Sequence, residues 1–326
     1  MKILLSIPEH TKTIPMGRFV EKALQQLGHE VYVFNYERDN QVERLREKIS
    51  YKSFLAYKNN QVLALVNTVK PDLFFTIYGN NHDAGTIEKI KQKGILTACW
   101  WLNDPFDLAY KHIPAHLYDY FFSNSRGTQA VYKHYQVKNA YYLPVGIDPS
   151  VHQPQPGVKK EYDIVFAGDW HPIREKVITE LSQHFSITMA GPWKRKIAKD
   201  SPLRSSFVNQ RFFTPAAMAE LFNKAHIVFN LHTWYGRWPY GVNPRLFEAS
   251  GCGAFQISDN KEEIKDLYLP GKEIILYDRV EEIPELFTYY LKHPAEGEAI
   301  AAQALKRTLQ SHTYVHRMQE MLDIIS

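Results

Sequence analysis

Short apolar runs alternate with segments of helical periodicity along most of this chain. Residues 2–7 form the first apolar run, and residues 17–27 have apolar positions at helical spacing that end at Gly28. Because the predicted strands are nearly all apolar and helices separate them, the pattern predicts a parallel sheet covered on both faces. In this half, further strands are predicted over residues 30–36, 72–77, 95–102, 120–124 and 141–143, and further helices over 60–69 and 83–93.

The stretch 144–160 interrupts this alternation, because it holds four prolines and has no apolar period, which predicts a linker. The sequence therefore predicts an α/β chain of two Rossmann-like, doubly wound domains, residues 1–150 and 151–310. The amphipathic residues 311–326 are predicted to form a helix that packs back on the first domain. In the second half, strands are predicted over 162–168, 186–191, 226–231, 254–257 and 273–277, and helices over 172–184, 215–224, 281–292 and 295–310.

Composition narrows the class of protein without specifying an activity. A chain of 326 residues, with 44% apolar and 23% charged residues, is long enough for two globular cores. The formal charge of +4 is small and no basic run resembles a nucleic-acid tail, so no nucleic-acid partner is expected.

Cys99 and Cys252 fit neither a metal-ligand spacing nor a disulfide framework. No apolar run reaches membrane-spanning length and residues 2–7 are too short for a signal peptide, which predicts a cytoplasmic protein without an integral membrane segment. The oligomeric state stays open.

Residues 240–258 hold the most informative local pattern: a loop, a short helix, a glycine turn and a strand. Asn243 is predicted as the helix N-cap and Pro244 as the first helical residue, and Arg245 and Glu248 then share one helical face. A cation beside exposed backbone N–H groups favours a phosphate, and a carboxylate one turn later can accept hydrogen bonds from sugar hydroxyls. The segment is therefore predicted to bind a nucleoside diphosphate. The alternative is a solvated helix with a weak surface ion pair.

Two turns that follow predicted strands extend this candidate site. Gly168 would let the backbone approach a ligand, and Arg174, in the first turn of the next helix, is the second basic candidate, ahead of Lys176. Gly191 opens the turn Gly191-Pro192-Trp193, where backbone groups and the Trp193 ring are predicted to bind the base of a nucleotide. The alternatives are surface charges on a helix and a tryptophan that packs against its own domain.

Asp104 is the candidate catalytic residue. It follows an apolar strand at the carboxyl end, where ligands of such sheets bind, and it could accept the proton of an acceptor hydroxyl. A partly desolvated site would raise its pKa towards that use. Asn103, on the acceptor side, is predicted to orient it. The alternative is a turn or cap formed by Asn-Asp-Pro, and His82 and His112 are weaker candidates for the same role.

Taken in order, these segments resemble the CgeB-like spore-maturation proteins, within the group 1 glycosyltransferases of GT-B fold. The most specific of them is Asn243-x-Arg245-x-Phe247-Glu248-Ala249. The resemblance covers nearly the whole chain, and it implies acceptor binding on residues 1–150 and nucleotide-sugar binding on residues 151–310. It further implies transfer of a sugar from a UDP- or dTDP-type donor to a surface polysaccharide, a glycoprotein or a related acceptor. The other segments that match are Lys70-Pro71-Asp72-Leu73, Trp100-Trp101-Leu102-Asn103-Asp104-Pro105, Leu143-Pro144-Val145-Gly146-Ile147-Asp148, Phe166-Ala167-Gly168, Gly191-Pro192-Trp193, Cys252-Gly253-Ala254-Phe255 and His312-Thr313-Tyr314-x-His316-Arg317.

One position departs from the group 1 pattern. Members often have two glutamates eight positions apart, the first near the donor sugar and the second on the ribose. Glu248 matches the second, whereas Tyr240 stands at the first. Tyr240 is kept among the donor-side residues, but a sugar contact or a retaining mechanism does not carry over to it. Two alternatives stay open: a sugar-nucleotide epimerase on the same architecture, and a spore or cell-surface protein that keeps the fold without catalysis.

Glycosyl transfer requires that the leaving diphosphate be neutralised, either by a metal ion on an Asp-x-Asp motif or by fixed basic groups. This sequence contains no Asp-x-Asp, so no metal and no cofactor are expected, and Arg245 is predicted to neutralise the diphosphate. Motifs of rival classes are also absent from the sequence: a phosphate-binding lysine loop, His-Glu-x-x-His and a serine nucleophile elbow.

Overall fold

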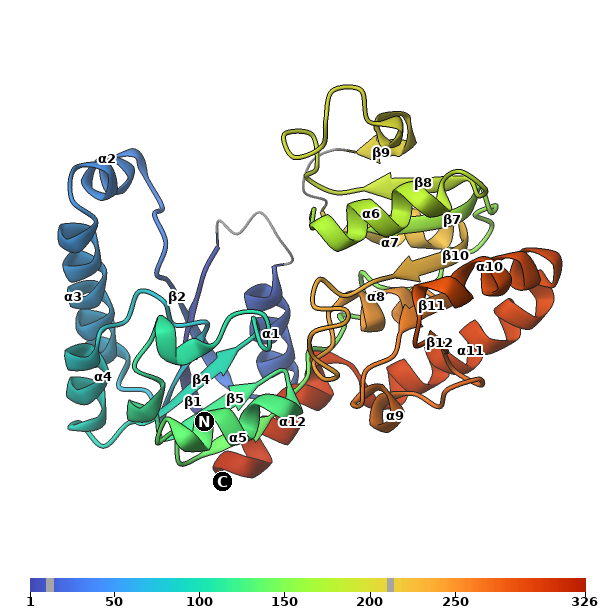
Figure 1. Cartoon of the computed structure of the whole chain (residues 1–326). Helices are drawn as coiled ribbons and strands as arrows, with labels where there is room; N and C mark the ends of the chain where they lie inside the picture. Colours follow the sequence, from blue (N-terminus) through green and yellow to red (C-terminus); the bar gives the residue numbers. More distant parts are fainter. Residues whose placement is uncertain (10–14, 210–213) are drawn as a thin grey trace. The chain divides into compact units, whose positions relative to one another are not determined.

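The computed structural model describes residues 1–9, 15–209 and 214–326, which form two compact units (Figure 1). The first unit consists of the described residues up to Pro144 together with Tyr314–Ser326, and the second consists of those from Val145 to Thr313. Each unit is built around a six-stranded sheet whose paired strands run parallel. The predicted α/β class, with two parallel sheets and helices around them, is confirmed.

The sheet of the first unit has the strand order β2-β1-β3-β4-β5-β6. Its middle strands are covered on both faces, and every residue of β3 is buried, which explains their apolar sequences. The strands are β1 (Lys2–Ile7), β2 (Glu30–Asn35), β3 (Leu73–Ile77), β4 (Leu96–Trp101), β5 (Tyr120–Ser123) and β6 (Ala140–Tyr142). The helices are α1 (Met16–Gln26), α2 (Gln41–Ile49), α3 (Tyr51–Val69), α4 (Ala84–Lys91), α5 (Gln129–His134) and α12 (Tyr314–Ile325), with short 3-10 turns at Ala109–Lys111, Ala115–Leu117 and Arg126–Thr128.

The sheet of the second unit has the order β12-β11-β10-β7-β8-β9. Its core includes Phe166, Trp193 and Phe229, packed ring against ring on one face of the sheet. The strands are β7 (Tyr162–Ala167), β8 (Ile187–Ala190), β9 (Phe207–Asn209), β10 (Ala225–Asn230), β11 (Gln256–Asp259) and β12 (Ile275–Tyr277). The helices are α6 (Pro172–Leu181), α7 (Pro215–Asn223), α8 (Arg245–Gly251), α9 (Ile264–Leu267), α10 (Ile283–Lys292) and α11 (Pro294–Ser311), with 3-10 turns at Pro202–Ser206 and Val280–Glu282.

The last helix returns to the first unit. Helix α12 lies against α1, and the ring of Tyr314 is 5.5 Å from that of Phe19 and 6.4 Å from that of Trp100 (Figure 1). Just before it, Thr313 pairs in parallel with Ile147. The chain therefore changes unit at Pro144–Val145 and again at Thr313–Tyr314, near residues 150 and 310, where the sequence-based boundaries were placed.

The region between β2 and β3 differs from the prediction. The sequence predicts one helix over residues 60–69, whereas the structure has α2 followed by the long helix α3. Asn40 caps α2 by accepting a hydrogen bond from the Glu43 N–H at 2.9 Å, and Ser50 caps α3 through the Ser53 N–H at 3.2 Å. Helix α2 has nine residues, of which three, Val42, Leu45 and Ile49, are apolar. None of the helices among the described residues is long and apolar enough to cross a membrane.

Candidate functional site

The predicted donor-side residues lie on the second unit, close to the carboxyl ends of its central strands. Gly168 follows β7 directly and Gly191 follows β8, while Asn243 ends the long connection that leaves β10. The carboxyl ends of parallel strands lie at one edge of the sheet. The fold therefore brings together segments that are as much as 75 positions apart, from Gly168 to Asn243.

The two glycine turns touch each other. A Cβ placed on Gly191 would lie 2.0 Å from the carbonyl oxygen of Gly168, and Gly191 has a φ of +150°. Only glycine allows this approach without a shift of the backbone. Trp193 completes the contact by donating from its indole nitrogen to the Gly168 oxygen at 2.8 Å. The turns are thus fixed to one another by backbone contact rather than by a ligand.

The position of Trp193 corrects one prediction. Its ring is fully buried, between Phe166 and Phe207, and it belongs to the core of the unit. A buried ring offers no face to a nucleotide base, so the predicted stacking is wrong, and the packing alternative describes the residue. The sequence could not separate the two, because a tryptophan after a strand is equally compatible with either.

Arg174 is a buried cation held by backbone carbonyl groups. Its Nε donates to the Leu231 oxygen at 2.8 Å, and its Nη1 donates to the Asp169 oxygen at 2.9 Å. The guanidinium lies 5.3 Å from the centre of the Phe166 ring. Burial and the positive charge of Arg245 lower the pKa of Arg174 to about 10, although Asp169 opposes the shift, so the group stays charged at neutral pH. The surface-charge alternative for Arg174 is therefore wrong.

Arg245 and Glu248 form an ion pair at the start of α8, as their spacing predicts. The Arg245 Nε also donates to the Ala167 oxygen at 3.2 Å, which ties the helix to the end of β7. Glu248 is only 2% exposed, because Arg245 covers it on one side and the His152 ring approaches its Oε1 to 3.9 Å on another. A ribose could reach this carboxylate only if Arg245 moved, so the ribose contact of Glu248 stays a prediction.

The start of α8 differs from the expectation. Pro244 occupies the N-cap position, without a side-chain cap, and the helix begins at Arg245. Asn243 instead forms a reciprocal pair with Asn230 at the end of β10: its Nδ2 donates to the Asn230 oxygen at 2.9 Å, and its own oxygen accepts at 3.3 Å. Asn243 thus fastens the loop to the sheet, and the capping prediction is wrong.

A buried charged network beneath this loop was missed by the sequence analysis. The His232 Nδ1 lies 2.7 Å from the Asp259 Oδ1, and Lys261 lies 3.1 Å from the Oδ2 of the same aspartate. The Nε2 of His232 accepts the backbone N–H of Asn243 at 3.0 Å. Because Nε2 accepts, Nδ1 must carry the proton that it donates to Asp259, which fixes the tautomer. Burial lowers the pKa of His232, so the ring is neutral.

This network had one weak signal in the sequence. His232 is the second residue after β10, and Asp259 is the last residue of β11. These strands pair in parallel at Asn230 and Ser258. Polar residues at the carboxyl ends of adjacent strands face a common edge. The spacing of 27 positions between them hides the relation until the strand order is known.

Tyr240 is half-buried, and its backbone is held more firmly than its side chain. Its carbonyl accepts from the Trp234 indole at 3.0 Å, and the next N–H, that of Gly241, donates to Glu263 at 2.5 Å. The loop from His232 to Asn243 is therefore anchored at Tyr240, Gly241 and Asn243. These anchors set the position of Arg245.

Together, these contacts leave two cations, Arg174 and Arg245, within electrostatic range of each other. Arg174 and Arg245 each use Nε and Nη1 on protein groups, and among the described residues neither Nη2 has a hydrogen-bond partner. Two guanidinium groups that repel each other, as the pKa of Arg174 reports, would be stabilised by an anion that both can bind. A diphosphate has the charge and the acceptor oxygens for this.

On the first unit, the surroundings of Asp104 do not fit the catalytic role predicted for it. Asp104 is 1% exposed, and Tyr132 donates to both of its oxygens at 2.8 Å while Ser123 donates to Oδ2 at 2.6 Å. Burial raises the pKa of Asp104 to about 7, in the direction expected, although these hydrogen bonds oppose the shift. An acceptor hydroxyl has no access to the carboxyl group in this structure. The network therefore supports the structural alternative, in which Asp104 fixes the segment after β4.

The other candidates on the first unit also have structural contacts. Asn103 is exposed and none of the hydrogen bonds of Asp104 comes from its side chain, so the predicted orienting contact is wrong. His82 is buried against Ser6 at 2.7 Å, and burial lowers its pKa to about 4. His112 stacks on Trp101 and lies 2.8 Å from Asp107.

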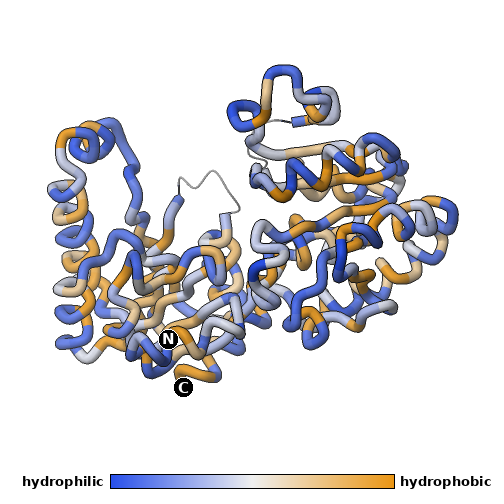
Figure 2. Tube along the Cα trace, in the orientation of Figure 1, coloured by the Kyte–Doolittle hydropathy of each residue, from blue (hydrophilic) through white to orange (hydrophobic). Residues whose placement is uncertain are grey.

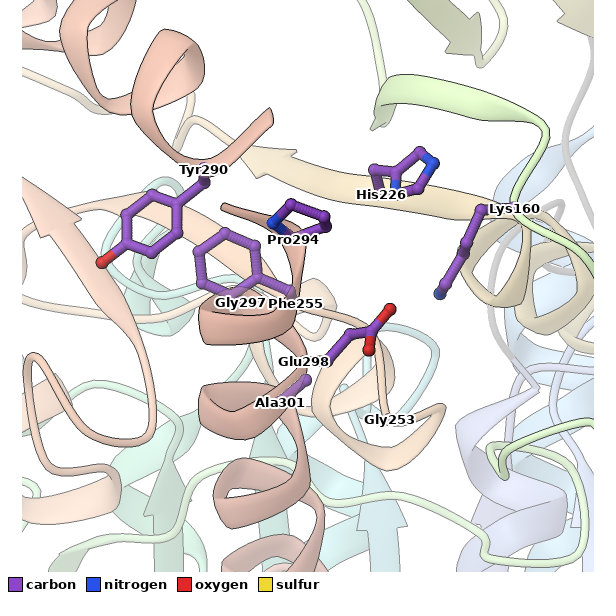
Figure 3. A pocket seen from close by; sticks show the side chains of 9 residues that line it. All are labelled: Lys160, His226, Gly253, Phe255, Tyr290, Pro294, Gly297, Glu298 and Ala301. Atoms are coloured by element: carbon purple, nitrogen blue, oxygen red, sulfur yellow. The ribbon is translucent and has the colours of Figure 1, made fainter. Parts of the chain in front are cut away.

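A small pocket of the second unit lies elsewhere, at the amino-terminal end of β10 (Figure 3). Lys160, His226 and Glu298 supply its polar groups, and Phe255 and Tyr290 supply its apolar wall. Because it opens at the opposite end of the strand from Asn230, it is separate from the arrangement around Arg174. Within residues 1–9, 15–209 and 214–326, no group of three or more His, Cys, Asp or Glu side chains could hold a metal ion.

Comparisons with known proteins agree with this geometry. Residues 172–323 match a family model described as glycosyl transferase-like. The chain is similar to the spore protein CgeB of Bacillus subtilis (strain 168), with 22% identity over 267 residues that cover 77% of this chain and 82% of that protein.

Two solved structures share the architecture over the whole chain. Sucrose-phosphate synthase from Thermosynechococcus elongatus matches with a TM-score of 0.73 and 11% identity, covering 100% of this chain and 98% of that one. HepE of Anabaena, in complex with UDP-glucose, matches with a TM-score of 0.65 and 13% identity, covering 100% and 99%. At these identities the likeness establishes the fold.

Proposed function

We propose that this chain, which has the GT-B fold and is similar to a glycosyl transferase-like family and to the spore protein CgeB, is a glycosyltransferase whose second unit binds a nucleotide-diphosphate sugar of the UDP or dTDP type. Transfer breaks the bond between the sugar C1 and the diphosphate oxygen and forms a bond from C1 to an acceptor oxygen, whose proton is released. The acceptor is a polysaccharide, glycoprotein or related glycan of a bacterial cell or spore surface. This acceptor class rests on the likeness to the spore protein CgeB.

The observation that supports this proposal is the pair Arg174 and Arg245. Both are attached by Nε and Nη1 to protein groups, and within the described part of the chain neither Nη2 has a hydrogen-bond partner. Negative charge develops on the diphosphate as its bond to the sugar breaks, and two fixed cations stabilise that charge without reorganisation. The same two groups make a metal ion unnecessary for this step, in agreement with a sequence that has no Asp-x-Asp.

The loop that ends at Asn243 has a positioning role in this proposal. The backbone of this loop is held by the buried network of His232, Asp259 and Lys261. The Asn243 side chain is held by Asn230. A site that is rigid before the ligand arrives loses less entropy on binding. Structures of HepE have been solved in complex with UDP and with UDP-glucose, so UDP and UDP-glucose are the first ligands to test.

Calorimetric titration with UDP, dTDP and GDP tests the proposal. We expect UDP or dTDP to bind, and we expect the affinity to be the same with magnesium and with a chelator, because arginines neutralise the diphosphate. Incubation with the UDP-sugar alone separates transfer from epimerisation, since an epimerase converts the sugar without an acceptor. Failure of all three nucleotides to bind would contradict the proposal.

A further inference from the structure

Helix α2 presents an unpartnered apolar stripe. Val42, Leu45 and Ile49 are 71%, 59% and 77% exposed, and their spacings of three and four residues place them on one side of the helix. Figure 1 shows α2 at the end of α3, and Figure 2 shows apolar positions alternating with polar ones along it. Exposed apolar residues are ordinary when they stand singly. Three on one face of a helix of nine residues need a physical reason.

The acidic side chains of α2 are turned away from this stripe. Glu43 is buried and lies 3.0 Å from the Nζ of Lys58 on α3, and it also accepts the backbone N–H of Asp39 at 2.7 Å. Glu47 lies 2.5 Å from Arg38. These ion pairs fix the rotation of α2, so the apolar stripe points outward because the opposite side is tied to α3 and to the segment before α2.

Cations border the stripe. At about 100° of rotation per residue, Lys48 lies on one side of it and Arg46 on the other, whereas Arg44 lies farther round the helix. Arg46 packs over the Tyr57 ring at 4.1 Å. Arg44, Lys48 and the following Lys52 are exposed, and no carboxylate pairs with them among the described residues. An apolar stripe flanked by Lys48 and Arg46, with the unpaired cations Arg44 and Lys52 near it, is the pattern of a helix that lies in the interface of an anionic membrane.

We propose that α2 docks the protein on an anionic lipid surface, with Val42, Leu45 and Ile49 inserted among the acyl chains. Lys48 then contacts a lipid phosphate, and Arg44 and Lys52 add positive charge close to the anionic surface. A second copy of the chain is a poorer occupant, because a symmetric contact through α2 would place these cations against their own copies. Three side chains on a short helix also bury much less than the roughly 800 Å² per partner of a stable protein interface.

The test uses co-sedimentation of the full chain with vesicles of phosphatidylcholine alone or mixed with phosphatidylglycerol. The parent should bind the mixed vesicles and not the neutral ones, and salt should weaken the binding. Replacing Val42, Leu45 and Ile49 together by Ser should abolish it. Each of Arg44→Gln, Lys48→Gln and Lys52→Gln should weaken it about fivefold, the equivalent of about 1 kcal/mol per cation.

Val208→Ser and Leu309→Ser are the matched controls, since these apolar residues are similarly exposed, at 51% and 44%, but lie on other elements. Both should bind vesicles like the parent, and all variants should keep the UDP affinity of the parent. Equal vesicle binding by the triple Ser variant would overturn the proposal. So would a parent dimer that becomes a monomer in that variant, or a fall in its melting temperature, because either result assigns the stripe to protein packing.

Discussion

Asp104 and Asp259 are both buried aspartates, but their pKa values are shifted in opposite directions. Among the described residues, Asp104 accepts hydrogen bonds only from hydroxyl groups, those of Ser123, Thr128 and Tyr132, and burial raises its pKa to about 7. For Asp259, burial alone would also raise the pKa, but His232 and the cation Lys261 together hold it below the ordinary value. The loss of water around a carboxylate raises its pKa. Hydrogen bonds from neutral groups do not outweigh this effect, whereas hydrogen bonds combined with a nearby cation do.

The raised pKa of Asp104 predicts a pH-dependent contribution to stability. A carboxyl group with a pKa of about 7 in the folded protein, against 3.8 in the unfolded chain, stabilises fully below the lower value and loses this contribution as the pH rises through the higher one. The difference in unfolding free energy between the parent and Asp104→Asn should therefore fall between pH 4 and pH 7. Its slope should be at most about 1.4 kcal/mol per pH unit. Urea unfolding over this range measures it, and a difference independent of pH would contradict the assignment.

Gly191 predicts a localised steric effect. Gly191→Ala places a Cβ within 2.0 Å of the Gly168 oxygen, so the two turns must separate, and we expect a loss of about 1–3 kcal/mol of stability together with weaker UDP binding. Gly236→Ala is the control, because Gly236 also has a positive φ, of +72°, but nothing lies within 4 Å of its Cβ position. Equal losses in thermal unfolding of the two variants would show that strain, and not the contact, decides the effect.

At the scale of elements, side chains connect β10 and β11 in addition to the backbone hydrogen bonds between these strands. The side chains are those of His232, Asp259 and Lys261. Asp259→Asn leaves Lys261 charged and unpaired at 3% exposure, so it should destabilise the protein by about 3–5 kcal/mol. Adding Lys261→Met removes the buried positive charge that has lost its carboxylate partner, and should recover part of the lost stability. Urea unfolding of the single and double variants measures the coupling, and a double variant less stable than Asp259→Asn would contradict the assignment of Lys261 as the uncompensated charge.

The strand and helix pattern was predictable from sequence because the buried parallel strands are nearly continuous apolar runs. Helix α2 was not, because ion pairs and a cap define it and its apolar residues face outward. The residues of the candidate site divide in the same way. The spacing of Arg245 and Glu248 predicts their contact, whereas the burial of Trp193 and Asp104 depends on which segments cover them. His232 and Asp259 meet only through the strand order.

At the scale of the whole molecule, each unit contains one parallel sheet, and the last helix, α12, belongs to the first unit. The donor-side residues all belong to the second unit, whereas Asp104 and α2 belong to the first. Nucleotide binding should therefore respond to changes around Arg174 and Arg245 and should be indifferent to changes on α2. This separation makes the proposed donor site testable independently of membrane docking.

Titration of UDP and uridine into the parent and Arg245→Gln tests the central claim most directly. Glutamine keeps an N–H donor for Glu248 but loses the charge, so UDP should bind about 10- to 150-fold more weakly, equivalent to about 1.5–3 kcal/mol, and uridine should bind unchanged. Arg279→Gln is the matched control, because Arg279 pairs with Glu282 three residues later but lies on the exposed surface, and it should bind UDP like the parent. Undiminished UDP affinity in a folded Arg245→Gln variant would contradict a diphosphate site at this arginine.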